Sequence, residues 1–215
     1  LGQAGPANAA PSDGGGTTPQ PGGTDQAVSR ATAALRRAYR DRLTAIVADD
    51  LTSADPIEHV PTVCRRMTEL ADAALDAALL VARAAVGPRA DDVALAVIAM
   101  GKTGARELNY ISDVDVVYVV GPTHKACGAQ EPISEERLVE VGTHVATELA
   151  HVVSATAPEP ALWPLDTALR PEGKDGALVR TLDSHLAYYR RWAASWEFQA
   201  LLKARACAGD IELGA

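Results

Sequence analysis

Two long segments near the start of the chain carry apolar residues at steps of three and four. In residues 25–51 the apolar positions are Val28, Leu35, Tyr39, Leu43, Ile46 and Val47. In residues 61–86 they include Met67, Leu70, Ala74, Ala77, Val81 and Ala85. Because such steps return to the same face of a helix, both segments are predicted to be amphipathic helices. Gly87-Pro88 is expected to end the second one.

Shorter apolar runs farther along the chain predict strands. Residues 93–99 form a run of strand length, and residues 113–120 are an almost unbroken series of β-branched side chains. Residues 162–169 resemble a third strand. Pro164 favours a place for this third strand at the edge of the sheet, because proline cannot donate a hydrogen bond to a neighbour.

Two further helices are expected. Ser134 is a good N-cap, and the glutamates that follow it suit the positive first turn of a helix that ends before Pro158. A last helix is predicted over residues 184–205. The resulting order of elements indicates an α+β fold, in which helices cover a small mixed sheet.

The composition divides the chain into three parts. Residues 1–24 are rich in Gly, Pro, Ala and Thr without periodicity, so we expect a flexible linker or loop. Residues 25–88 are expected to form a helical lead-in. Residues 89–215 are expected to form the core domain with its C-terminal helix.

Composition also narrows the function. The 215 residues carry a formal net charge of −8, which argues against a nucleic-acid partner, because a nucleic-acid backbone requires a basic track. No apolar run is long enough for a membrane span. The three cysteines, Cys64, Cys127 and Cys207, lie far apart, which favours a reducing cytoplasm. The chain begins with Leu1, and we expect a piece of a longer protein.

The chemistry concentrates at the start of the second predicted strand. Asp113 and Asp115 are two residues apart, so in a strand their carboxylates point to the same face. Two carboxylates this close repel each other, and a divalent cation relieves the repulsion. Hard oxygen ligands suit Mg²⁺, or Mn²⁺, bridging the phosphates of a substrate. Asp166 in the third predicted strand is placed to complete the metal site.

Residues that suit phosphate precede this acidic pair. The turn Gly101-Lys102-Thr103-Gly104 offers backbone N–H groups, and Ser112 offers a hydroxyl group. Arg170, four residues after the third acid, offers a cation. The candidate nucleotide- or phosphate-binding residues are therefore Gly101, Lys102, Gly104, Ser112 and Arg170. The order of glycine turn, acidic pair and later Asp resembles the nucleotidyltransferase superfamily related to DNA polymerase β.

Two longer blocks narrow the resemblance. The segment GKTGARELNYISDVDVVYV is similar to the G-K-x-G-x-R-E-L-N-Y-x-S-D-x-D block of the bifunctional glutamine synthetase adenylyltransferase/adenylyl-removing family. The segment LRPEGKDGALVRTLDSHLAYYRRWAASWEFQALLKARACAGD resembles the second block of that family. The resemblance implies a DNA polymerase β-like nucleotidyltransferase core with a small mixed sheet and packed helices.

The first block is most similar to the amino-terminal domain of actinobacterial members. The resemblance implies a Mg²⁺-dependent enzyme that removes AMP from a tyrosine of glutamine synthetase by phosphorolysis and releases ADP. Two alternatives stay open: the domain that transfers AMP from ATP to that tyrosine, or a degenerate regulatory or docking module. The implied partners are glutamine synthetase, ADP or ATP, phosphate and, through the full-length protein, a PII-type regulator.

Some residues depart from the family pattern or carry weaker signals. Ala99 and Ala105 stand where the family usually has small or glycine residues, and an added methyl group would crowd the turn if either site needed a positive φ. Lys203 and Arg205 are either phosphate-binding cations or partners of nearby acids. Glu197 is expected to be structural. The histidines of the 134–157 helix are expected to be a helix face rather than a zinc site, and the aromatic residues near Trp192 a packing seam.

Overall fold

The computed structural model describes residues 22–127 and 132–215. The predicted linker, residues 1–24, lies almost wholly outside the described residues. Its last two residues are the exception, because helix α1 (Gly23–Leu51) already begins there. Within the described residues, each helix is too short or too polar to cross a membrane.

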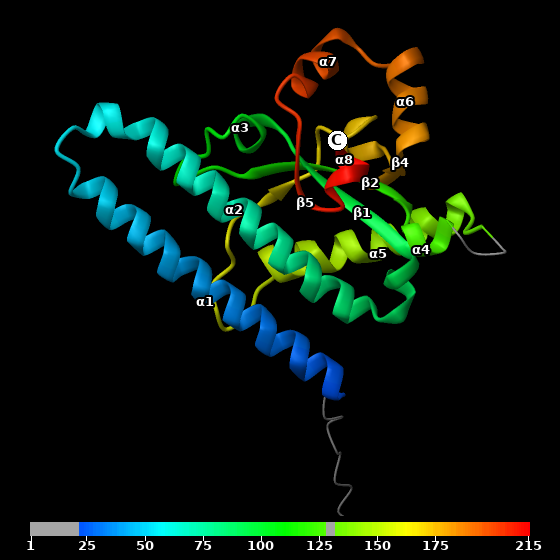
Figure 1. Ribbon diagram of the computed structural model, residues 1–215, viewed down its shortest axis with the longest axis horizontal. Helices are drawn as coiled ribbons and strands as arrows, with labels where there is room; N and C mark the ends of the chain where they lie inside the picture. The colour runs from blue at the N-terminus through cyan, green and yellow to red at the C-terminus, as the bar shows by residue number, and fades with distance from the viewer. Residues whose placement is uncertain (1–21, 128–131) are drawn as a thin grey trace, which may run out of the picture.

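The two predicted N-terminal helices form a long antiparallel hairpin, α1 and α2 (Pro56–Val86), which Figure 1 shows in blue and cyan. The predicted end of α2 at Gly87 is confirmed. Its predicted start is five residues late, because Pro61 lies inside the helix rather than at its beginning. The helix begins at Pro56, whose missing N–H group costs nothing in the first turn, and Asp55 caps it by accepting from the N–H of Glu58 (3.2 Å).

A short 3₁₀ helix, η1 (Pro88–Asp92), leads into the sheet. Strand β1 (Val93–Ala99) pairs antiparallel with β2 (Val114–Pro122), and β5 (Arg205–Gly209) pairs antiparallel with the other edge of β1. Two short strands run parallel to β2, namely β3 (Leu165–Asp166) beside its beginning and β4 (Val179–Thr181) beside its later part. The sheet is therefore small and mixed, as the sequence predicted.

Helices cover both faces of this sheet (Figure 1). Helices α2 and α5 (Glu135–Ser154) bury the face that carries Leu95, Val97 and Val116 in one apolar core. Ser134 caps α5, as predicted, by accepting from the N–H of Arg137 (3.3 Å). The other face is covered in part by α6 (Leu182–Arg191) and α8 (Ile211–Gly214). A single turn, α4 (His124–Cys127), follows β2.

The predicted last helix over residues 184–205 is wrong. The chain instead forms α6, a break at Trp192–Ala194, α7 (Ser195–Leu201) and then β5. The carboxylate of Glu197 accepts from the N–H of Ala194 (2.7 Å) and from the hydroxyl of Tyr188 (2.9 Å), which starts the new helix at the break. Glu197 is therefore structural, as expected. The local sequence of β5, which contains two alanines, favours a helix. Pairing with β1 makes the segment a strand instead.

The third predicted strand is much shorter than expected. Of residues 162–169, only Leu165 and Asp166 pair with β2. Pro164 lies just before them, and its carbonyl accepts from the N–H of Val114 (3.0 Å). Strand β3 is at the edge of the sheet, as Pro164 predicted.

A buried arginine ties the first helix to the core. Arg36 is fully buried, and its guanidinium donates to the carbonyls of His151, Val152, Ala155 and Glu159 at 2.8–3.2 Å. The first three of these carbonyls lie at the C-terminal end of α5, where the helix dipole favours a positive charge. Arg36 therefore fixes the position of α1 on the domain.

Candidate active site

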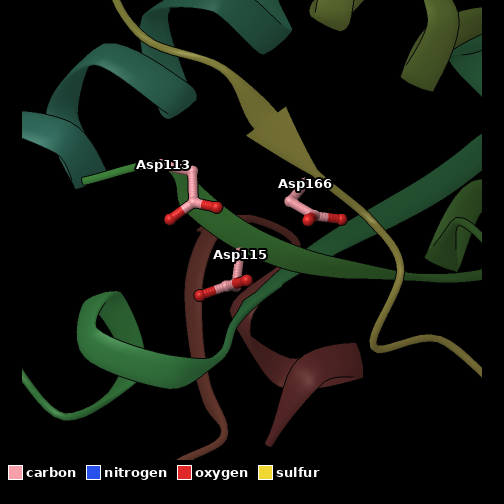
Figure 2. A group of neighbouring side chains, drawn as sticks. All are labelled: Asp113, Asp115 and Asp166. Atoms are coloured by element: carbon pink, nitrogen blue, oxygen red, sulfur yellow. The ribbon is translucent and has the colours of Figure 1, made fainter. Parts of the chain in front are cut away.

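Three carboxylates converge where β2 and β3 run side by side. Asp113 precedes β2, Asp115 is its second residue, and Asp166 is paired with Asp115 in the parallel register of the two strands. One oxygen atom from each carboxylate lies within 4.8 Å of the other two. Figure 2 shows the three side chains around one common space. The structure thus brings together the three acids that the sequence analysis selected.

Backbone contacts hold each strand in this arrangement. The carbonyl of Asp115 accepts from the N–H of Met100 at the end of β1 (2.9 Å). The Oδ1 atom of Asp166 accepts from the N–H of Ala168 (2.7 Å), which orients this carboxylate within the loop after β3. Because these contacts come from the main chain, the positions of the carboxylates are set by the fold itself.

The mutual repulsion of the acids is visible at Asp115. Burial raises the pKa of Asp115, and the neighbouring carboxylates of Asp113 and Asp166 raise this pKa further, while the ammonium of Lys102 lowers it. Without a bound cation, the ionised carboxylates therefore repel one another. Three hard oxygen donors around one space fit a divalent cation of the Mg²⁺ or Mn²⁺ type, and such an ion would relieve the repulsion.

The glycine turn lies directly against this cluster. Residues Gly101–Gly104 form a single helical turn, α3, that follows β1. Gly101 has a φ of +51°, and a Cβ atom at this position would lie 2.4 Å from Oδ2 of Asp115. At Gly104 a Cβ atom would lie 2.0 Å from the carbonyl oxygen of Lys203. Both glycines are therefore needed for close packing, one against the acids and one against the chain before β5.

Lys102 and Ser112 meet beside the acids. The ammonium of Lys102 donates to the hydroxyl of Ser112 (3.2 Å), and that hydroxyl donates to Oδ1 of Asn109 (2.7 Å). The ammonium of Lys102 also lowers the pKa of Asp115 by its positive charge. The predicted contacts of both side chains with phosphate stay predictions.

Arg170 has a different environment from the one expected of a phosphate ligand. Its guanidinium donates to the carbonyls of Thr167 (2.8 Å), Gly176 (3.1 Å) and Lys174 (3.0 Å). These contacts close the loop after β3 around the guanidinium. Phosphate binding by Arg170 stays a prediction, while the observed hydrogen bonds describe a side chain that supports the loop.

Lys203 and Arg205 are partners of acids rather than open cations. Arg205 pairs with Asp72 of α2 (2.8 Å) and donates to the carbonyl of Thr103 in α3 (3.2 Å). Lys203 pairs with Glu107 (3.0 Å). Lys203 and Arg205 therefore support the segment that contains the glycine turn. Asp72 was not singled out from sequence, because its partner is remote in the chain and only folding brings the two together.

The departures from the family pattern cause no backbone strain. Ala105 has a φ of −74°, and Ala99 ends β1 as a buried residue. Among the described residues, the non-glycine positions with a positive φ are Arg106 and Glu172. The methyl groups of Ala99 and Ala105 therefore occupy ordinary backbone conformations.

Two weaker expectations have different outcomes. His144 contacts Arg89 (3.2 Å) and His151 pairs with Glu148 (3.8 Å), so these histidines belong to a helix face, as expected. The aromatic packing seam is only partly present. Tyr188 and Tyr189 pack edge to face at 5.6 Å, whereas Trp192 is 68% exposed.

Comparison with known proteins shows the family of the chain. The family model described as glutamate-ammonia ligase adenylyltransferase matches residues 23–215. The chain belongs to this family. The match includes both the α1–α2 hairpin and the sheet that carries the three carboxylates.

Curated relatives agree with the family assignment. Proteins named bifunctional glutamine synthetase adenylyltransferase/adenylyl-removing enzyme are 48% identical over 190 residues in Bifidobacterium longum strain DJO10A and 51% identical over 188 residues in Nocardia farcinica. The protein of that name in Mycolicibacterium smegmatis is 50% identical over 193 residues. These alignments cover 87%, 86% and 88% of this chain, but only 17%, 17% and 18% of the relatives. The chain thus spans less than a fifth of the length of these proteins.

Proposed function

We propose that this chain is a Mg²⁺-dependent nucleotidyltransferase domain that acts on glutamine synthetase. In the proposed reaction, AMP is removed from an adenylylated tyrosine by inorganic phosphate, and ADP is released. The observation that carries the proposal is the convergence of Asp113, Asp115 and Asp166 beside a glycine turn in a member of this family. The direction rests on the similarity of the block from Gly101 to Asp115 to the removing domain of actinobacterial relatives.

The acid cluster is the part of the site that would hold the metal. Asp113, Asp115 and Asp166 supply the carboxylate oxygens, and Mn²⁺ would fit the same donors. When bound, the metal neutralises charge on the phosphoryl group and helps align the entering and departing oxygens. The fixed register of β2 and β3 keeps the three oxygens in place before a substrate arrives.

The glycine turn and its neighbours form the proposed phosphate side of the site. Because Gly101 approaches Asp115 closely, backbone N–H groups at the start of α3 would be near a phosphate bound at the cluster, while the N–H of Gly104 donates to the carbonyl of Met100 (2.8 Å). Lys102 and Ser112 offer further donors from the same side. These groups would hold the inorganic phosphate that attacks the phosphorus of AMP.

The product identifies the direction. Adenylylated glutamine synthetase mixed with the chain, phosphate and Mg²⁺ is expected to release ADP, measured by chromatography. An Asp113→Asn/Asp115→Asn variant with an unchanged circular dichroism spectrum is the matched inactive control. Consumption of ATP with release of pyrophosphate on unmodified synthetase would instead assign the chain to the adenylylating domain. Absence of turnover in both directions, with synthetase still bound, would indicate a docking module.

A further inference from the structure

A groove opens beside the acid cluster, along the loop that follows β3. Its volume is about 410 Å³, and its walls include Asp113, Asp166, Arg170 and Lys174. Neither Asp115 nor any residue of α3 lines it. The groove therefore borders the cluster at Asp113 and Asp166, whereas α3 packs against Asp115, so different members of the cluster face these two neighbours.

The separate positions of α3 and the groove suit a displacement reaction at a phosphorus atom bound at the cluster. In a displacement at phosphorus, the attacking and departing oxygens lie roughly in line, on opposite sides of the phosphorus atom. Under the proposed function, on which this inference rests, inorganic phosphate occupies the side of α3. The groove is then left for the tyrosyl oxygen and the segment of the protein substrate that carries it.

Lys174 is the cation that suits this groove. The sequence contains four lysines, and two of the others, Lys102 and Lys203, are each bonded to a neighbouring side chain. Among the residues that the structure describes, the ammonium of Lys174 makes no hydrogen bond or ion pair. Its carbonyl, in contrast, is held by the guanidinium of Arg170 (3.0 Å). Lys174 thus combines a fixed backbone with an ammonium group available to a ligand.

The loop that carries Lys174 is supported from two directions. From inside, Arg170 donates to carbonyls on both sides of the loop, at Thr167 and Gly176. From outside, Glu172 pairs with Arg180, and the N–H of Glu172 donates to the hydroxyl oxygen of Tyr188 (3.3 Å). The guanidinium of Arg170 is therefore used to position the loop, which leaves Lys174 as the groove's cation for the substrate.

We propose that Lys174 is a catalytic residue that stabilises the departing tyrosyl oxygen. In the step, the bond between the AMP phosphorus and the phenolic oxygen breaks while a bond forms to an oxygen of HPO₄²⁻. The phenolic oxygen leaves with the electron pair and then takes up a proton, because a tyrosine phenol has a pKa of about 10. The new ADP releases the proton that the phosphate brought. The ammonium of Lys174 offsets the negative charge that develops on the phenolic oxygen.

Leaving-group dependence tests this role. Glutamine synthetase is prepared with tyrosine or with 3,5-difluorotyrosine, whose phenol is more acidic, and both forms are adenylylated. Lys174→Gln is expected to lower kcat on the tyrosine form by on the order of 10- to 100-fold, the scale of a lost transition-state contact. On the difluorotyrosine form the loss should be several-fold smaller, because a better leaving group needs less stabilisation.

Two variants complete the experiment. Lys174→Arg keeps the positive charge and should recover most of the activity. Lys125→Gln removes the same charge from α4, which follows the far end of β2 from the acids, and should leave kcat unchanged on both substrates. The KM for phosphate should stay the same in all variants, because phosphate occupies the other side of the cluster.

The possible outcomes distinguish a failure of the proposed role of Lys174 from a failure of the proposed function. An equal loss of kcat on both substrates, or a raised KM for phosphate, would show that Lys174 does not stabilise the departing tyrosyl oxygen. Full activity of Lys174→Gln beside an active unmodified chain would overturn the inference alone. An unmodified chain without turnover in either direction would overturn the proposed function, and the role of Lys174 with it.

Discussion

Asp115 and Asp166 lie opposite each other in the parallel register of β2 and β3, although they are far apart in the sequence. The pairing extends over only two residues of each strand. The N–H of Val114 also donates to the carbonyl of Pro164, which extends the contact just beyond this pair. A strand as short as β3 thus serves mainly to bring the third carboxylate to the first two.

Divalent cations should bind in a nucleotide-dependent way. Three carboxylates leave coordination positions open, so Mg²⁺ or Mn²⁺ should bind weakly alone and more tightly with ADP present. Isothermal titration with and without ADP measures this difference. Asp113→Asn/Asp115→Asn should abolish it, while Asp25→Asn/Asp41→Asn, two exposed acids of α1, should not. Equal metal affinity in both double variants would contradict the metal site.

Loss of the third acid should impair catalysis more than folding. Asp166→Asn keeps the size of the side chain but removes one charge from the cluster. Turnover is expected to fall on the order of 10²-fold or more, as for other lost electrostatic contacts in a transition state. ADP release and the thermal unfolding midpoint are measured on the same sample. A folded and fully active variant would show that the third ligand lies elsewhere.

The metal-free protein should gain stability when Asp115 is neutralised. The pKa of Asp115 is raised in the folded state, so its ionised form disfavours folding above that pKa, and this penalty disappears as the pH falls through it. Asp115→Asn should therefore raise Tm at neutral pH in the presence of EDTA. The difference from the unmodified chain should shrink toward acidic pH. A lower Tm at neutral pH would contradict the proposed repulsion.

Gly101→Ala should damage the site through its contact with Asp115. The positive φ alone costs about 1–2 kcal/mol for a residue with a Cβ atom. Gly87→Ala is the matched control, because Gly87 has a φ of +77° with nothing within 4 Å of an added Cβ atom. Both variants should lose stability in urea unfolding, but only Gly101→Ala should lose metal binding and turnover. Unimpaired binding in Gly101→Ala would show that the turn can move away from the acids.

Arg36→Ala should be strongly destabilising. The substitution removes the guanidinium that four carbonyl groups share, and among the described residues only the carbonyl of His151 has a second donor, the N–H of Ala155 (3.0 Å). We expect a loss of about 3 kcal/mol or more in the free energy of unfolding. The neighbouring Arg37 pairs with Glu159 at the surface, so Arg37→Ala should cost less than about 1 kcal/mol. Urea unfolding of both variants tests the difference. Similar losses would mean that Arg36 does not anchor α1.

The local pattern of the sequence was sufficient for most helices and for the acidic pair. The three- and four-residue steps predicted α1 and α2, and Ser134 predicted the start of α5. Alternation along a strand placed Asp113 and Asp115 on one face. Each of these predictions depends on neighbours within a few residues, and such interactions act in the same way in any fold.

Long-range pairing decided the rest. Residues 184–205 read as one helix, yet Glu197 starts a new helix within them, and pairing with β1 turns the following segment into β5. Phosphate binding by Arg170 stays a prediction, and the structure adds that its guanidinium donates to carbonyls of its own loop. The sequence by itself was enough to select the three acids that the structure brings together. Tertiary structure decided which residues meet, because strand pairing and buried ion pairs depend on partners that are distant in the chain.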